Sequence, residues 1–271
     1  MSTKRAVVLA RGLGTRMRVA EHEAVLTGAQ QRAADAGFKA MMPIGGRPFL
    51  DYVLSALADA GLRDVALVVA PDHELVRRYY REQAQPSRVE LTFVVQDEPH
   101  GTADAVLAAR FWTEDQAFLT MNGDNLYPVE VLRDLAALDE PGLPVFERGD
   151  LVASGNIPPD RVRAFALVES DERGYLTRVI EKPPIEAMQA AGERARVSMN
   201  CWRFDSRIFA ACRDVPGSAR GEFELPEAVA LAVQRGVRFR TLPARGPVLD
   251  LSRRADAAEV SRVLAGVVPS P

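Results

Sequence analysis

The chain has 271 residues, of which 47% are hydrophobic and 26% charged, a balance typical of a soluble globular protein with a full core. A formal net charge of −3 gives no general reason to expect nucleic acid or an anionic membrane as a partner, and no apolar run approaches the roughly 20 residues of a membrane span. Cys201 and Cys212, with no histidines clustered near them, favour neither a disulfide framework nor a zinc site. We therefore expect a cytoplasmic protein with no membrane contact and no nucleic acid partner.

The first apolar run, residues 6–10, stops abruptly in Gly12-Leu13-Gly14-Thr15-Arg16. A short buried strand followed by glycines and a basic residue offers backbone N–H groups and a guanidinium to phosphate. The stretch is not a Walker A loop, because the Gly-Lys-Ser/Thr ending is missing. It also fails as a dinucleotide fingerprint, because Met17 replaces the third glycine. The alternative is a plain glycine-containing turn after an edge strand.

Strands and helices then alternate along the first half of the chain. The apolar periodicity predicts helices over residues 19–37, 48–60, 73–83, 101–112 and 129–138, and strands over 64–69, 89–96 and 117–122. This alternation indicates a mainly parallel sheet with helices on both faces. Ligands of such sheets bind beyond the carboxyl ends of the strands, where residues 11–18, 96–102 and 123–125 form loops.

The second half begins with residues 141–159, whose prolines and glycines predict a long connection. Beyond it we expect a hairpin of residues 161–169 and 175–181, strands over 197–204 and 237–242, and helices over 205–212, 226–235 and 252–264. Residues 267–271 are expected to fray.

Taken in order, these loops resemble those of the sugar-1-phosphate nucleotidyltransferases. The resemblance rests on residues 9–17, 39–44, 46–50, 101–105 with Gln96, 123–124, 181–183, 199–200, 221–225 and 249–251. It implies an α/β fold, a Rossmann-like three-layer sandwich with a mixed, mainly parallel central sheet. It also implies one domain over residues 1–271, with a nucleotide-binding half (1–140) and a sugar-binding half with C-terminal helices (141–271).

The implied reaction is attack by a sugar 1-phosphate oxygen on the α-phosphorus of a nucleoside triphosphate, which releases pyrophosphate. Such a displacement asks the protein for positioning and charge neutralisation. The resemblance assigns Mg²⁺ to Asp124 and Asp250, the leaving pyrophosphate to Arg16, the α-phosphate to Lys39 and the sugar phosphate to Lys182. The alternatives are a turn aspartate for Asp124, a helix cap for Asp250, and solvated surface roles for the three cations.

The remaining site residues are predicted to contact the nucleotide or the sugar. Gln96 offers an amide donor and acceptor that match a pyrimidine edge, so UTP or dTTP is favoured, with adenosine as a competitor. The nucleotide set is Leu9, Ala10, Arg11, Gly12, Gly14, Thr15, Gln96, Gly101 and Thr102. The sugar set is Asn122, Glu181 and Asn200.

Four departures from the family pattern leave questions open. Arg11 replaces a small residue, the interval from Arg16 to Lys39 is long enough for an inserted helix, and Phe165-Ala166 and Cys201-Trp202 lie where the sugar is expected. Two rival functions also stay open: a glycosyltransferase, although its D-x-D motif is absent after Gly123, and a sugar-nucleotide-binding protein without turnover. The sequence names neither the sugar nor the oligomeric state, so a homo-oligomer stays open.

Overall fold

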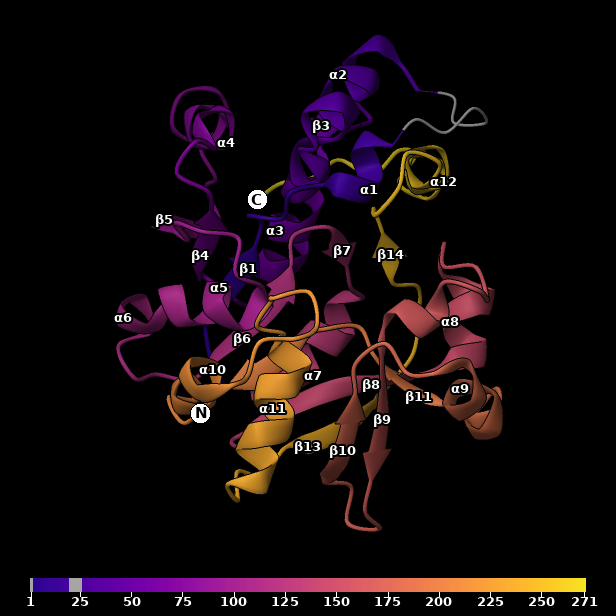
Figure 1. Ribbon diagram of the computed structural model, residues 1–271. Coiled ribbons are helices and arrows are strands. Elements are labelled where there is room, and N and C mark those ends of the chain that lie inside the picture. Colours follow the sequence, from indigo (N-terminus) through magenta and orange to yellow (C-terminus); the bar gives the residue numbers. More distant parts are fainter. Residues whose placement is uncertain (1, 20–25) are drawn as a thin grey trace.

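A single ten-stranded sheet runs through the computed structural model, which describes residues 2–19 and 26–271 (Figure 1). Its strands are β1 (Arg5–Leu9), β4 (Asp64–Val69), β5 (Glu90–Val95), β6 (Phe118–Asn122), β8 (Gly142–Glu147), β9 (Ala166–Ser170), β10 (Leu176–Ile180), β11 (Arg196–Ser198), β12 (Trp202–Phe204) and β13 (Arg240–Ala244). The order across the sheet is β10-β9-β11-β8-β12-β6-β1-β4-β5, and β13 pairs with β8.

The sheet is mixed, as the sequence predicts. β1 pairs in parallel with β4 and β6, and β4 pairs in parallel with β5, so the strands that lead into the first loops all point the same way. From β12 to β10 the neighbours are antiparallel. The hairpin β9–β10 turns at Asp171, whose carboxylate accepts from the backbone N–H groups of Arg173 and Tyr175.

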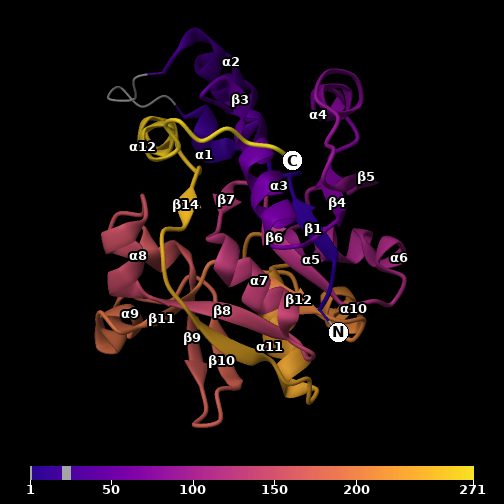
Figure 2. The ribbon, with the colours of Figure 1, turned by 180° about the vertical axis from the view of Figure 1, so that it is seen from behind.

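Helices cover both faces of the sheet and make three layers. Along β1, Ala6 and Val8 pack into one hydrophobic cluster and Val7 into the other, because successive side chains of a strand point to opposite faces. One face carries α3 (Phe49–Asp59), α7 (Val129–Ala137), α8 (Arg148–Ser154) and α12 (Asp256–Val263). The other carries α5 (Thr102–Ala108), α10 (Ile208–Asp214) and α11 (Leu225–Gln234), as the opposed views in Figures 1 and 2 show.

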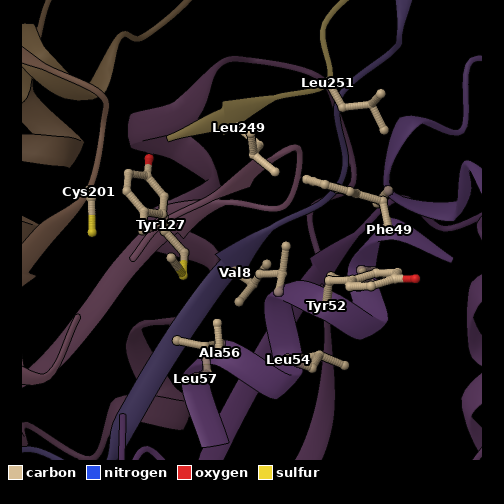
Figure 3. Close-up of a cluster of buried hydrophobic side chains, with 14 of the residues drawn as sticks. Val8, Phe49, Tyr52, Leu54, Ala56, Leu57, Tyr127, Cys201, Leu249 and Leu251 are labelled. Carbon is tan, nitrogen blue, oxygen red and sulfur yellow. The ribbon is translucent and has the colours of Figure 1, made fainter. Parts of the chain in front are cut away.

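The C-terminal part of the chain packs onto the N-terminal half. Figure 3 shows side chains of α3 gathered near Val8 of β1, together with Leu249 and Leu251. Leu249 belongs to β14 (Leu249–Asp250), which pairs antiparallel with β7 (Asn125–Leu126) outside the main sheet. This small ladder places residues near 125 and 250 side by side.

The other elements are short. They are α1 (Thr15–Arg18), α2 (Gly28–Ala36), a 3-10 turn (Lys39–Met41), β2 (Pro43–Ile44), β3 (Arg47–Pro48), α4 (Glu74–Arg78) with a π-helical turn (Tyr79–Gln83), α6 (Arg110–Thr113), a 3-10 turn (Val162–Ala164) and α9 (Ile185–Ala191). Within the described part of the chain, no helix combines the length and the apolar character needed to cross a bilayer.

The helix expected over residues 19–37 is wrong at its start. α2 begins at Gly28, where Thr27 caps it and Gln30 completes a capping box. Residues 20–25 lie outside the described part of the chain. The C-terminal end is as predicted, because Gly37 adopts φ 75° there.

The long connection expected over residues 141–159 is also wrong, because it holds β8 and α8. Pro144 obscured the strand. β8 pairs with β12 only at Gly142 and with β11 only at Phe146 and Glu147, so Pro144 lies between these two pairings. Pro144 also pairs with Leu242 in the parallel ladder between β8 and β13.

Residues 197–204 form two strands instead of one. β11 ends at Ser198 and β12 starts at Trp202, and they occupy different places in the sheet. The break occurs at Asn200, whose φ of 63° is incompatible with a continuous strand.

The last residues do not fray as expected. Pro269 and Pro271 are buried, and Ser270 N–H donates to Ser55 Oγ at 2.7 Å. The backbone N–H groups of Ser87 and Arg88 donate to Pro271 O at 2.9 and 3.2 Å. These bonds hold the segment against α3.

Candidate active site

A cavity of about 400 Å³ opens beyond the carboxyl ends of β1 and β6. Every site residue predicted from the sequence lines it: Leu9, Ala10, Arg11, Gly12, Gly14, Thr15, Arg16, Lys39, Gln96, Gly101, Thr102, Asn122, Asp124, Glu181, Lys182, Asn200 and Asp250. The fold therefore brings together side chains from both halves of the chain, at the edge of the sheet where parallel strands bind ligands.

The two glycines of the first loop have different structural roles. A Cβ at Gly12 would meet no atom within 4 Å, so the backbone there is open to a ligand. Gly14 adopts φ 62°, and a Cβ there would lie 2.2 Å from Gly37 O at the end of α2. The second glycine is thus required by helix packing, which fixes the loop in front of Arg16.

Arg16 and Lys39 supply positive charge on this side of the cavity. Arg16 is exposed in α1, and within residues 2–19 and 26–271 it forms no ion pair, so its guanidinium remains available for a ligand. Lys39 Nζ lies 2.9 Å from Asp124 Oδ2, with side chains 16% and 22% exposed. Lys39 therefore neutralises one of the two carboxylates predicted to hold a metal.

Asp124 and Asp250 are held next to each other by the β7–β14 ladder. Asp250 pairs with Asn125 in that ladder, and Leu251 N–H donates to Asp124 O at 2.9 Å. The side chains of Asn125 and Ser252 donate to Asp250 Oδ2 at 3.0 and 3.1 Å. The capping alternative for Asp250 is excluded, because Asp256 accepts from the backbone N–H groups of Ser252 and Arg253 before α12.

Arg161 contacts the buried carboxylate and was missed by sequence reasoning. It is 95% buried, and its guanidinium lies 3.1 Å from Asp250 Oδ1 and 2.6 Å from Asp256 Oδ1. Burial raises the pKa of Asp250 to about 6, nearby Asp124 adds to the shift, and Arg161 opposes it. An arginine at the start of an expected hairpin carries no sequence signal for this contact.

At the base end of the cavity, Arg11 joins two loops. Its Nε and Nη2 donate to the backbone carbonyls of Gln96 and Asp97 at 3.2 and 3.0 Å, so it pairs with no acidic side chain there. Gly101 has φ 109°, and a Cβ there would lie 2.5 Å from Phe223 O. The close approach of residue 223 therefore requires glycine at this position, whether or not a ligand also contacts it.

The prediction that Gln96 offers a ligand both an amide donor and an acceptor is wrong. Its Nε2 donates to Gly101 O at 3.0 Å and to Asp104 Oδ2 at 2.7 Å, which uses both amide hydrogens. Only Oε1 remains for a ligand. Thr102 Oγ1 accepts from Leu225 N–H at 2.9 Å and so links the first turns of α5 and α11.

A row of amide side chains connects the sugar end to the carboxylates. Asn200 Nδ2 donates to Asn122 Oδ1 at 3.0 Å, and Asn122 Nδ2 donates to Asn125 Oδ1 at 3.3 Å. Trp202, one of the departures noted in the sequence, donates its indole N–H to Asn200 Oδ1 at 2.8 Å. Trp202 therefore orients Asn200 from behind and does not reach into the cavity itself.

Charged residues of both signs line the opposite wall. Lys182 has φ 46°, and its Nζ lies 3.3 Å from Oε1 of Glu181 and 3.3 Å from Oε1 of Glu224. Arg220 forms ion pairs with Glu224 and with Glu222, the latter at 2.9 Å. Burial raises the pKa of Glu181, and Lys182 opposes the shift. Sequence reasoning missed Arg220, although it directly precedes the motif of residues 221–225.

The donor set fits Mg²⁺ better than a metal that needs several protein ligands. Within the described residues no cluster of three or more His, Cys, Asp or Glu side chains is placed to hold a metal. Asp250 Oδ1 is buried beside Asp124, forms an ion pair with Arg161 at 3.1 Å and accepts no hydrogen bond from the described residues. Mg²⁺ is commonly held by one or two carboxylates and completes its shell with phosphate oxygens and water.

Residues 5–247 match the protein family described as "Nucleotidyl transferase". The UTP--glucose-1-phosphate uridylyltransferase AglF of Haloferax volcanii is 27% identical over 260 residues, which cover 96% of each chain. A glucose-1-phosphate thymidylyltransferase of Streptomyces antibioticus is 29% identical over 96% of this chain and 66% of its own length.

The low-salt glycan biosynthesis nucleotidyltransferase Agl11 of Haloferax volcanii is 24% identical, and this chain likewise spans 66% of its length. Among solved structures, a UDP-glucose pyrophosphorylase complexed with UDP-glucose superposes with a TM-score of 0.74 at 17% identity, over 96% of this chain and 97% of that one. This likeness shows that the fold is shared.

Proposed function

The chain belongs to the nucleotidyl transferase family, and from this premise we propose that it joins a nucleoside triphosphate to a sugar 1-phosphate and releases pyrophosphate. The family resemblance indicated by the sequence is thereby confirmed. Relatives are named as uridylyl- and thymidylyltransferases acting on glucose 1-phosphate, which supports UTP or dTTP as the nucleotide and makes glucose 1-phosphate the first sugar to test.

The observation that carries the proposal is the charge distribution of the cavity. Arg16 and Lys39 line the cavity from the first half of the chain, and Lys182 and Arg220 line it from the second. The two carboxylates, Asp124 and Asp250, line the same cavity. Cations from both halves of the chain, together with a pair of carboxylates, suit a reaction that brings two phosphorylated substrates together.

On the nucleotide side, the open backbone at Gly12 and the guanidinium of Arg16, which forms no ion pair with the residues that the structure describes, bind the β- and γ-phosphates. Arg16 stabilises the charge that develops on the leaving pyrophosphate. Lys39 leaves Asp124 when the substrates bind and donates to the α-phosphate oxygens. Asp124 and Asp250 would hold Mg²⁺, which would supply charge neutralisation at the reacting phosphate.

On the sugar side, Lys182 and Arg220 orient the attacking phosphate toward the α-phosphorus. The Glu181 carboxylate accepts hydrogen bonds from the sugar hydroxyls. The Asn200 amide donates hydrogen bonds to them or accepts hydrogen bonds from them. Both Lys182 and Asn200 have left-handed backbone conformations, which are uncommon for residues with a side chain and occur often at binding sites. Pre-positioning of these two side chains by their backbone supports the assignment.

Cys201 and Cys212 are both unpaired and buried, and this supports the proposal that the enzyme works in the reducing cytoplasm. The oligomeric state stays open.

A substrate panel tests the proposed function. Pyrophosphate release is measured with each common nucleoside triphosphate against several sugar 1-phosphates, with and without Mg²⁺. We expect release with UTP or dTTP, only in the presence of both substrates and the metal. Release of a nucleoside diphosphate from a nucleotide sugar would instead identify a glycosyltransferase. Tight binding without exchange of labelled pyrophosphate would identify a non-catalytic binding protein.

A further inference from the structure

We propose that Asp104 is a positioning residue that sets the base specificity of the cavity by fixing which end of the Gln96 amide faces the nucleotide. The inference rests on the proposed function and adds the residue that selects the nucleotide. It begins from the hydrogen bonds of one buried amide.

Gln96 follows β5 directly, and only 4% of its surface is exposed. Its backbone N–H donates to Val69 O at 3.0 Å, and its carbonyl accepts from Arg11 Nε at 3.2 Å. The main chain is therefore anchored on both sides. What remains to be decided is the orientation of the side-chain amide, which has a donor end and an acceptor end.

The two partners of Gln96 Nε2 decide that orientation without ambiguity. Gly101 O and a carboxylate oxygen of Asp104, at 3.0 and 2.7 Å, are both acceptors. A flipped amide would direct Oε1 at a carbonyl and at a negative charge, which repel it. A carbonyl alone accepts one amide hydrogen, whereas the additional carboxylate makes the donor end strongly preferred.

Asp104 lies where the fold favours a carboxylate. It is the third residue of α5, in the turn where backbone N–H groups of a helix favour negative charge. A carboxylate oxygen accepts hydrogen bonds, so it favours the orientation in which Gln96 Nε2 points toward it. Asp104 thus acts on the ligand through Gln96 and lies outside the cavity lining itself.

The consequence is a fixed acceptor, Gln96 Oε1, at the base end of the cavity. Among the described residues Oε1 has no hydrogen-bond donor of its own. Uracil and thymine carry an N–H at ring position 3, which Oε1 accepts. Cytosine carries an unprotonated nitrogen at the same position, which Oε1 repels. The arrangement therefore favours UTP or dTTP over CTP.

The test compares Asp104→Asn with the wild-type enzyme. An asparagine offers either an acceptor or a donor, so it supports both orientations of Gln96. We expect the ratio of kcat/KM for UTP to that for CTP to fall at least about tenfold, since one misplaced hydrogen bond is worth about that factor. Asp104→Ala leaves Gly101 O as the sole partner of Gln96 Nε2. We expect its ratio of kcat/KM values to lie between those of the wild-type enzyme and Asp104→Asn.

The matched control is Glu227→Gln, which removes a carboxylate from the first turn of α11, away from the cavity. A purely structural role of a first-turn acid predicts similar losses of thermal stability in both variants and an unchanged base ratio. We expect the base ratio to change in Asp104→Asn alone. An unchanged ratio in folded Asp104→Asn and Asp104→Ala would overturn the inference.

Calorimetric binding of UTP and CTP separates this inference from the proposed function. If the wild-type protein prefers UTP in binding yet releases no pyrophosphate, the proposed reaction is wrong while the base ratio still tests Asp104. If it turns over but binds UTP and CTP equally, the inference alone is wrong. A protein that binds neither nucleotide contradicts both.

Discussion

Lys39 Nζ lies 2.9 Å from Asp124 Oδ2, in a position where the cation and a bound Mg²⁺ would compete for the same carboxylate. Substitution of Asp124 by asparagine removes that charge with little change of shape. We expect Asp124→Asn to lower kcat at least ~100-fold, because an electrostatic stabiliser of the reacting phosphate is lost. Steady-state kinetics measure the loss.

The fold should tolerate this change, because Asp124 is partly exposed. Thermal unfolding of Asp124→Asn should therefore stay close to that of the wild-type protein. The control is Asp134→Asn, which replaces an exposed carboxylate on α7 and should keep full turnover. Near-normal turnover of Asp124→Asn would discard the assignment.

Arg11 connects the glycine loop to the end of β5 through two backbone carbonyls. We expect Arg11→Ala to raise KM for the triphosphate about tenfold or to change nucleotide preference, because the segment that carries Gln96 loses a charged hydrogen-bond donor worth about 1.5–3 kcal/mol. Arg11→Lys should recover part of the loss. Unchanged kinetics with every triphosphate would show that Arg11 has no functional role.

At the scale of residues, the sequence locates the cavity lining but not the bonds inside it. Motifs such as Gly12–Arg16 and Gly101–Thr102 specify backbone conformation, so they can be recognised directly in the sequence. Gln96 Nε2 donates to Asp104 of α5, and Asp250 forms an ion pair with Arg161. Both contacts join different segments of the chain. Such pairings depend on side-chain positions in the fold, which a pattern of residue types does not specify.

At the scale of elements, Asn200 shows how a site residue shapes secondary structure. Its left-handed conformation ends β11 and lets β12 start in another place in the sheet. The apolar pattern of residues 197–204 predicts one strand because both pieces are buried. Likewise the proline in β8 obscured a strand, whereas the uninterrupted apolar runs within β1 and β4 were recognisable.

Arg254 links three elements near the glycine loop. It is buried before α12, and it donates to Met17 O at 2.8 Å, to Arg18 O at 3.1 Å and to Asp35 Oδ1 at 2.7 Å. We expect Arg254→Ala to lower the free energy of unfolding by about 2 kcal/mol, because Met17 O loses a buried hydrogen bond and two partly buried hydrogen bonds are lost with it. The KM for the triphosphate should rise as well, since α1 carries Arg16.

The control for this prediction is Arg262→Ala on α12, the helix that follows Arg254. Arg262 pairs with Glu259 at the surface, where solvent screening leaves an ion pair little net effect on stability. Denaturant unfolding and the KM for the triphosphate are measured for both variants. Equal effects of the two substitutions would show that Arg254 does not position the loop.

At the scale of the whole molecule, the cavity draws its two walls from distant parts of the chain. Strands from residues 5–122 and 142–244 share one sheet, and the separate β7–β14 ladder brings Asp124 and Asp250 together. The cost of this convergence is the burial of Asp250 beside Asp124: desolvation, with repulsion by Asp124 added to it, raises the pKa of Asp250 to about 6. The charge of the cavity therefore depends on pH near neutrality.

The sign of this dependence follows from the direction of the shift. Because the folded protein binds the Asp250 proton more tightly than the unfolded chain does, the stabilisation from that proton is present at low pH and is lost as the pH rises through about 6. Mg²⁺ held as we propose would reverse the balance, since it would bind the ionised carboxylate. Proton and metal would then compete at this site.

We accordingly expect the affinity for Mg²⁺ to be constant above about pH 7 and to fall below about pH 6, approaching a tenfold loss per pH unit where Asp250 is protonated. Isothermal titration with Mg²⁺ and a bound triphosphate, repeated from pH 5 to pH 8, measures this change. Asp250→Asn leaves Asp124 as the remaining carboxylate and should bind Mg²⁺ more weakly, with little pH dependence over the same range. If the wild-type affinity is as independent of pH as that of Asp250→Asn, then Asp250 does not contribute to metal binding.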